Sequence, residues 1–236
     1  MRLPANFAGV CGHKPSFGVV PQRGYIDHVS YGSTDADINV FGPLARTVSD
    51  LELLFGVLNG SADDSKSGWQ VRLPNSRASS ENLRVAAWLD DPSCPVSSSV
   101  LSVLDETVQA IEADGVAVNR SARPEVVFDD VRTVGMPLIS AATSPGRTSE
   151  EFAALVETAA DPASDSTLRM RAASSTMSHR DWLLMTEQRN INRRLWSDFF
   201  CDFDVLLAPV AFSPAFEHQS EGNLYTRTLE VDGAVR

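Results

Sequence analysis

Lysine is scarce in this sequence, and this scarcity limits the chemistry that the chain could perform. The 236 residues include only two lysines, Lys14 and Lys66, and neither has a serine three residues before it. Lys66 lies in the polar run SADDSKSG, where we expect a solvated side chain rather than a buried one. The sequence also contains no G-x-S-x-G and no H-E-x-x-H. It therefore lacks the motifs typical of a nucleophile elbow and of a zinc peptidase.

Cysteines and long apolar runs are also few. The cysteines are odd in number, far apart in the sequence and without a C-x-x-C pair. This pattern argues against a disulfide framework and against a structural zinc site. Four histidines are present, none at metal-ligand spacing from another, so the histidines give no indication of a metal site. No apolar run approaches the roughly 20 residues of a membrane span. We expect a protein of the reducing cytoplasm that does not bind membranes. The three cysteines are Cys11, Cys94 and Cys201.

Acidic residues outnumber basic ones, 31 to 20, for a net charge of −11. This balance excludes the basic footprint of a nucleic-acid-binding protein. The arginines at 189, 193 and 194 form a local basic cluster, which we interpret as a solvated helix face. Carboxylates also occur as adjacent pairs, and neighbouring side chains diverge, so these pairs are expected to cap or solvate rather than act as an acid and a base. The pairs are Asp63 and Asp64, Asp90 and Asp91, and Asp129 and Asp130.

The middle of the chain has the pattern of a β-α-β unit. The apolar run at 83–89 predicts a buried strand, and 116–119 predicts the next strand. Between them, serines at 97–99 offer helix caps, and the amphipathic segment 100–115 ends in glycine and predicts a helix. A strand, a crossover helix and a second strand indicate parallel or mixed pairing in an α/β layer fold.

Other segments give less complete patterns. The amino-terminal 46 residues are rich in glycine, proline and aromatic residues, and between 9 and 24 glycine or proline recurs about every third position. This pattern predicts tight loops and short strands held by Phe7, Val10, Phe17 and Val19. The remaining expectations are a helix at 48–59 capped by Thr47, mostly helical structure at 120–177 with breaks near Pro137, Pro145 and Pro162, a helix at 182–201 capped by Ser178, a strand at 204–210, and loops at 211–236.

Four blocks in order resemble the amidase signature family. Residues 2–5 (RLPA) match the end of the signature, and 9–24 (GVCGHKPSFGVVPQRG) is similar to the family segment G-V-x-G-x-K-P-[ST]-x-G-x-V-[SP]. Residues 41–60 (FGPLARTVSDLELLFGVLNG) resemble its G-P-[ML]-A-R-[ST]-V-x-D helix start. The β-α-β unit and the strand at 204–209 (DVLLAP) follow in the expected order. The resemblance implies an α/β fold with a mixed β-sheet core and helices on both faces.

Amidase signature enzymes hydrolyse carboxamides by acyl transfer through a Ser-cisSer-Lys triad, without a metal or organic cofactor, as the resemblance implies. In the family pattern, the nucleophile stands two residues before the arginine that corresponds to Arg2. The nucleophile, the middle serine and the base lysine would therefore fall upstream of Met1. We expect residues 1–236 to form a partial amidase domain that lacks this catalytic part and the carboxyl-terminal end, and that is inactive alone.

The candidate site residues that remain are few. Arg2, Pro4 and Ala5 are the remnant of the signature, and Cys11 and His13 are candidates for lining the cleft. For Cys11 we favour a small buried side chain over a nucleophile, and for His13 packing over a direct role. His28, His179 and His218 receive no specific function.

The sequence leaves two main functional hypotheses. A third, an unrelated α/β enzyme with a different site, would require the resemblance of the four blocks to be a coincidence. The first is part of an amidase whose intact relative takes a small-molecule amide. The alternative is a non-catalytic binding or regulatory remnant of an amidase-like protein. Either hypothesis leaves apolar faces uncovered, so self-association is expected, with no nucleic-acid or membrane partner.

Overall fold

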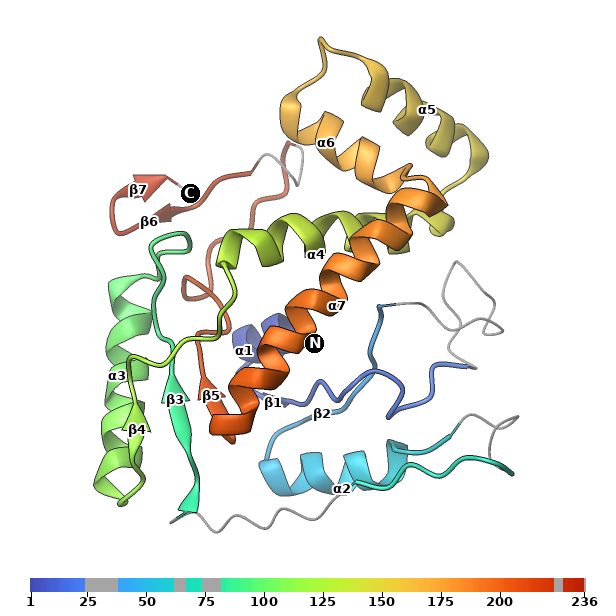
Figure 1. Cartoon of the computed structure of the whole chain (residues 1–236). Helices are drawn as coiled ribbons and strands as arrows, with labels where there is room; N and C mark the ends of the chain where they lie inside the picture. The colour runs from blue at the N-terminus through green and yellow to red at the C-terminus, as the bar shows by residue number, and fades with distance from the viewer. Residues whose placement is uncertain (24–37, 62–66, 74–81, 223–226, 236) are drawn as a thin grey trace.

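The computed structural model describes residues 1–23, 38–61, 67–73, 82–222 and 227–235. Three of the sequence-based interpretations concern residues outside these ranges, namely Lys66, His28 and the pair Asp63 and Asp64. Within them, seven α-helices accompany a parallel sheet and two small antiparallel pairs (Figure 1).

A three-stranded parallel sheet lies at the centre of the chain, in the order β4-β3-β5. Strand β3 (Val85–Ala87) pairs with β4 (Val118–Asn119) on one side and with β5 (Val205–Leu207) on the other. All three residues of β3 are buried, as expected for a short apolar run with layers on both sides. The predicted β-α-β unit and the later strand are therefore confirmed, although each strand is shorter than its apolar run.

The connections place helices on both faces of this sheet. From β3 the chain reaches β4 through α3 (Ser98–Ala113), and from β4 it crosses back over β3 to β5 by way of α4 (Phe128–Thr143) and α7 (His179–Asp202). The two crossovers run in opposite directions along the sheet, so right-handed connections put their helices on opposite faces. Figure 1 shows α3 on one side and α7 on the other. The α/β class is confirmed, and the described sheet is parallel where a mixed one was expected.

Side-chain caps begin several helices where the sequence predicted them. The Thr47 hydroxyl accepts the Asp50 N–H at 3.1 Å and starts α2 (Val48–Leu58). Ser97 caps α3, and Ser178 accepts the Asp181 N–H at 3.1 Å at the start of α7. Each cap satisfies a backbone donor that the first helical turn leaves unpaired.

The amino-terminal region differs from its prediction. Residues expected to form loops contain helix α1 (Arg2–Ala8), and a short antiparallel pair joins β1 (Cys11–Gly12) to β2 (Leu44–Ala45). Pro4 is compatible with α1 because it stands in the first turn, where no helical N–H bond is lost. The expected packing is wrong for Phe17, which is 53% exposed, whereas Phe7, 40% exposed, packs against Phe216 from the far end of the chain.

A helical region extends from the sheet between β4 and β5. Helix α4 continues through Pro137, so the break predicted there is wrong, whereas Pro145 falls in a 3-10 turn (Ser144–Gly146) and Pro162 follows α5. Helices α5 (Ser149–Ala160) and α6 (Ser166–Ser175) pack together, and α6 also contacts α4. Near the carboxyl terminus, where only loops were expected, Glu230–Val231 (β6) pairs with Ala234–Val235 (β7).

An ion pair joins β3 to β5 at the amino edge of the sheet. The Arg84 guanidinium donates to both oxygens of the Asp204 carboxylate, from Nε at 3.0 Å and from Nη2 at 2.8 Å. The Arg84 backbone N–H donates to the same carboxylate at 2.9 Å. Hydrogen bonds from the Arg84 side chain and backbone lower the pKa of Asp204 to about 2. The carboxylate thus couples the alignment of two strands that are far apart in sequence.

This pairing predicts a pH dependence of stability. The pKa of Asp204 in the folded chain lies below the ordinary value of about 3.9. The ionised carboxylate therefore stabilises the fold fully above about pH 3.9, and this stabilisation is lost as the pH falls toward about 2. We expect the melting temperature of the native chain to exceed that of Asp204→Asn at neutral pH, with the difference narrowing between about pH 4 and pH 2. Differential scanning calorimetry of both proteins at several pH values, from neutral to about pH 2, measures this difference in melting temperature. Asp198→Asn, on an exposed part of α7, is the control, and a constant difference for Asp204→Asn contradicts the role assigned to the ion pair.

Candidate functional site

The signature remnant forms helix α1 and its contact with β1. Ala5 is buried, while Arg2 and Pro4 are exposed. The Ala5 carbonyl accepts the N–H of Val10 at 3.0 Å, because Gly9 turns the chain back with a φ of 66°. A side chain on Gly12 would place its Cβ 2.9 Å from the Ala5 Cβ. The absence of a side chain on Gly12 therefore lets β1 lie directly against helix α1.

Cys11 and His13 lie beside this contact. Cys11 is half-buried, and the His13 N–H donates to the Pro43 carbonyl at 3.1 Å. The His13 ring meets the Phe55 ring edge to face, with centroids 4.6 Å apart. These contacts give His13 a packing role between β1 and α2. Neither residue lines the cavity described below, and their assignment to a cleft stays a prediction.

Lys14 is the one lysine in the described ranges. Burial lowers its pKa, and the positive charge of Arg2 lowers it further. No hydrogen bond joins Lys14 to a serine in the part of the chain that the structure describes. The described residues also contain no cluster of three or more metal-ligand side chains. The residues seen here therefore assemble neither a Ser–Lys pair nor a metal centre.

An apolar cavity of about 580 Å³ opens at the carboxyl edge of the parallel sheet. Its walls come from α1, the segment after β3, the start of α4, the last turns of α7, and the segment after β5. Ligands of parallel α/β sheets commonly bind at this edge, because the loops that follow the strands meet there. Six of the lining side chains are aromatic: Phe7, Trp88, Phe128, Trp196, Phe212 and Phe216.

The aromatic side chains are arranged in two groups. Trp88 meets Phe128 edge to face with centroids 6.3 Å apart, and it lies 6.5 Å from Trp196 at an interplanar angle of 30°. On α1, Phe7 meets Phe216 edge to face at 5.8 Å. Edge-to-face and offset contacts are the favourable arrangements of aromatic rings. The rings therefore hold one another in place and form defined walls.

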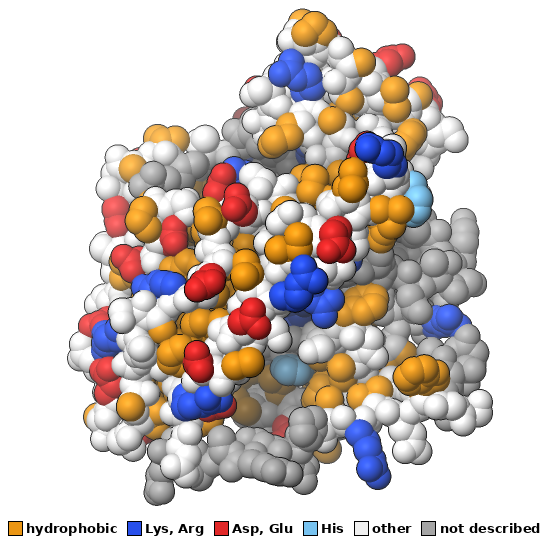
Figure 2. All heavy atoms as spheres, viewed as in Figure 1, with side chains coloured by type: hydrophobic (Ala, Val, Ile, Leu, Met, Phe, Trp, Pro, Cys, Tyr) orange, Lys and Arg blue, Asp and Glu red, His pale blue; other side chains and the backbone are white. Residues whose placement is uncertain are grey.

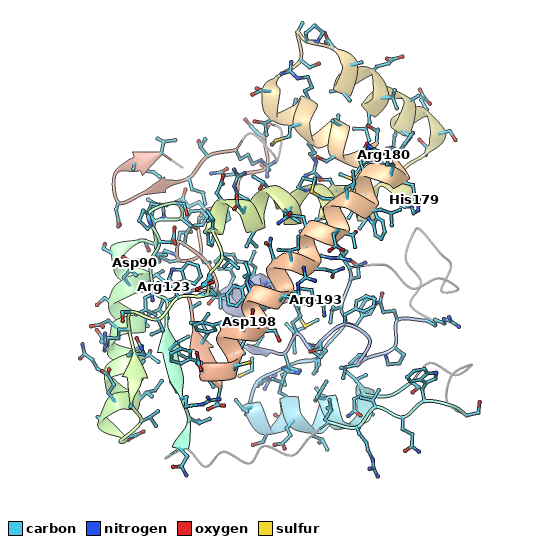
Figure 3. The ribbon with its side chains drawn as sticks, in the orientation of Figure 1. Asp90, Arg123, His179, Arg180, Arg193 and Asp198 are labelled. Carbon is cyan, nitrogen blue, oxygen red and sulfur yellow. The ribbon has the colours of Figure 1, made fainter. Side chains whose placement is uncertain are left out.

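Among the described residues that line the cavity, the two charged ones are both acidic. Asp90 and Asp91 follow β3, and Asp90 is exposed. Hydrogen bonds from Ser93 lower the pKa of Asp91, and Arg123 and Trp88 add smaller contributions. Arg123 lies over the Trp88 ring at 5.6 Å and donates to the Ala87 carbonyl at 3.1 Å, which places it with Asp90 at the end of β3 (Figure 3). Asp91 is thus a turn residue, as expected from the sequence.

Sequence inspection did not find this cavity. Its residues come from distant segments, and helical periodicity assigns Trp196 simply to the apolar face of its helix. The signal that was present is an aromatic residue directly after a buried strand, Trp88, followed by two carboxylates at positions where parallel strands end. That pattern could have indicated a site at this edge.

The two remaining described histidines, to which the sequence analysis gave no function, lie outside the cavity. His179 stacks on Trp182 at the start of α7, and His218 is exposed in the segment after β5. Figure 3 shows His179, Arg180, Arg193 and Asp198 spread along α7 rather than gathered in one place. No helix in the described ranges is both long and apolar enough to cross a membrane.

Comparisons with known proteins agree with the resemblance in the sequence. The family model "Amidase" matches residues 1–234. The chain is 26% identical over 223 residues to an indoleacetamide hydrolase of Bradyrhizobium diazoefficiens, covering 91% of this chain and 40% of the relative. It is 24% identical over 266 residues to a glutamyl-tRNA(Gln) amidotransferase subunit of Clostridium botulinum, covering 99% of this chain and 53% of that protein.

A solved structure shares the fold. The crystal structure of a bacterial aryl acylamidase of the amidase signature enzymes superposes with a TM-score of 0.66 at 19% identity, over 98% of this chain and 48% of that one. The chain thus spans about half, or less, of the length of these proteins.

The tight packing beside the signature remnant predicts the effect of a small substitution. A Cβ on Gly42 would lie 2.1 Å from the His13 carbonyl oxygen and 2.7 Å from the Pro15 Cδ. Since the first of these atoms is backbone, we expect Gly42→Ala to destabilise the fold by about 1–3 kcal/mol, measured by urea unfolding. Gly56→Ala, where a Cβ meets nothing within 4 Å, is the control and should be neutral or stabilise α2 by up to about 1 kcal/mol. If Gly42→Ala and Gly56→Ala changed the free energy of unfolding equally, the steric crowding described at Gly42 would be refuted.

Proposed function

The chain belongs to the amidase family, and from this premise we propose that it takes part in carboxamide hydrolysis by serine acyl transfer, within a polypeptide that supplies the attacking serine. The observation that carries the proposal is the family match over 1–234. The relatives, by their names, act on amide bonds, one as an indoleacetamide hydrolase and another as part of an amidotransferase, which supports the same chemistry.

The proposal includes inactivity of the 236 residues alone. A serine hydroxyl attacks a carbonyl only when a nearby base accepts its proton. Lys14 has no serine partner among the described residues, and the burial that lowers its pKa is only partial, since its side chain is largely exposed. The three free cysteines suit a reducing compartment and support a cytoplasmic setting for this chemistry.

The turnover experiment compares two polypeptides. The purified 236-residue chain, given simple carboxamides, should release no ammonia above the level of its Lys14→Met variant, and a fluorophosphonate probe for activated serines should not label it. The protein encoded by the whole reading frame, read from the DNA on both sides of codons 1–236, should release ammonia and be labelled at one serine upstream of Arg2. Single-site labelling of the short chain would contradict its inactivity. An unlabelled and inactive long protein would contradict amide hydrolysis.

A second candidate function is a non-catalytic binding protein derived from an amidase. The observation that favours it is the aromatic cavity at the carboxyl edge of the sheet, to which described residues from several distant segments contribute. The upstream DNA separates the two candidates. An in-frame Gly-Gly-Ser and a Gly/Ser-rich segment there support the hydrolase, and a stop codon there supports the binding protein.

We also propose self-association through uncovered apolar surface. Helix α2 has no buried residue, although its sequence is strongly apolar. Exposed apolar side chains also appear across the face shown in Figure 2. Large exposed apolar patches in soluble proteins commonly mark contact surfaces. The exposed apolar side chains of α2, between 41% and 77% exposed, are Val48, Leu53, Leu54, Val57 and Leu58.

Charged substitutions on α2 test this association. Leu53 and Val57 are 70% and 77% exposed and lie one turn apart, so the double substitution Leu53→Lys and Val57→Lys should interrupt the patch without opening a core. We expect the native chain to show a mass that rises with concentration in sedimentation equilibrium, and the variant to shift toward the monomer by at least about tenfold in its dissociation constant, roughly 1.4 kcal/mol. Val103→Lys on α3, 62% exposed, is the control. A native chain that is monomeric at all concentrations contradicts the proposal.

A further inference from the structure

The carboxyl-terminal end of α2 is followed by the one asparagine in this sequence that stands directly before a glycine, Asn59 before Gly60. Because glycine has no Cβ, its backbone nitrogen is open to attack by, or on, the side chain of the preceding residue. We propose that this pair is a modification site at which Asn59 deamidates, and that the folded end of α2 suppresses the reaction until α2 opens. The reaction needs water alone, so it is independent of the amide hydrolysis proposed above.

Deamidation at this site is an intramolecular substitution. The Gly60 nitrogen loses its proton to solvent and attacks the Asn59 Cγ, the new bond closes a succinimide ring, and the side-chain nitrogen leaves as ammonia. Water then opens the ring at either carbonyl and leaves aspartate or isoaspartate. In sum, a carboxamide and water become a carboxylate and ammonium. Both products are negatively charged where the asparagine was neutral.

Hydrogen bonds at the end of α2 hold both reacting groups. The Gly60 N–H donates to the Val19 carbonyl at 3.0 Å, so the attacking nitrogen is engaged with another segment. The half-buried Asn59 side chain turns back along the helix, where its Nδ2 donates to the carbonyls of Phe55 at 2.9 Å and of Gly56 at 3.2 Å. Ring closure requires both sets of hydrogen bonds to break, so it must follow a local opening of this helix.

The same hydrogen bonds make the product unfavourable in the fold. The Asn59 side chain donates to the last carbonyls of α2, where a helix has acceptors without a partner. A carboxylate cannot donate to them, and its charge lies at the negative end of the helix dipole. Deamidation therefore weakens the end of α2, and a chain that has reacted opens more readily than one that has not.

The rate of deamidation at Asn59 tests the proposal on the purified 236-residue chain. Peptide mapping by mass spectrometry follows the conversion of Asn59 at a mildly alkaline pH, and conversion should be at least about tenfold faster in urea than in the folded chain. Gly60→Ala is the matched control, because the added Cβ meets nothing within 4 Å and the φ of Gly60 lies outside the left-handed region. In urea, Gly60→Ala should react at least about tenfold more slowly than the native sequence.

A second pair of variants locates the opening in α2. Thr47→Ala removes the side-chain cap at the other end of this helix, far from the reacting atoms. Its loss should raise the open fraction of α2, and with it the rate at Asn59 in the folded chain, by about fivefold. The rate in urea should not change. Thr148→Ala, which removes the corresponding cap of α5, is the control and should leave the rate at Asn59 unchanged.

The variant Asn59→Asp shows the effect of the product on stability. It carries the charge of the deamidated residue, so its melting temperature should lie below that of Asn59→Ala, which loses the hydrogen bonds alone. Equal melting temperatures of the two variants contradict the effect assigned to the charge.

Three results would overturn the proposal. Equal rates at Asn59 in the folded and the unfolded chain would mean that the fold gives no protection. Equal acceleration by Thr47→Ala and Thr148→Ala would mean that the whole chain must unfold, and no acceleration by Thr47→Ala would separate the site from α2. Because the readout is the mass of one peptide rather than turnover, failure of this proposal and failure of amide hydrolysis are distinguishable.

Discussion

Strand β3 is the constraint on which the other elements depend. Its three residues are buried on both faces and hydrogen-bonded along both edges, to β4 and to β5. Buried backbone groups are costly when they are unpaired, so the strand is stable only with both neighbours in place. One neighbour follows after a single crossover helix, whereas the other arrives after the whole helical region. The packing of α4 and α7 is therefore coupled to the pairing of the sheet.

The same arrangement creates the cavity. At the ends of β3 and β5 the Trp88 N–H donates to the Leu207 carbonyl at 2.9 Å, and residues of both segments that follow line the cavity. Helix α7 ends just before β5 and contributes Trp196 to the lining, while Phe7 of α1 meets Phe216 of the segment after β5 in another part of the lining. A group of aromatic side chains is thus gathered by the strand ends rather than by any one local segment.

The parts of the fold that follow from local interactions could be predicted from the sequence. The caps at Thr47 and Ser178 and the buried run at β3 depend on residues that are neighbours in the chain. Helix α1 was missed because glycine and proline are frequent around it, although Pro4 occupies a helical position that tolerates proline. Helix α4 likewise contains Pro137 without ending there, since packing against α6 and α7 supports it on both sides. The cavity depends on contacts between distant segments, and periodicity carries no information about those.

The position of the Arg84–Asp204 pair has a consequence for how the domain can vary. The pair holds the alignment of β3 and β5 from the edge opposite to the cavity, with four hydrogen bonds from Arg84 to Asp204 and to the Cys201 carbonyl. Insertions or exchanges in the segments after these strands need not shift the strands themselves. A family built on this sheet can therefore diversify its ligands by changing one edge while the other keeps the scaffold in register.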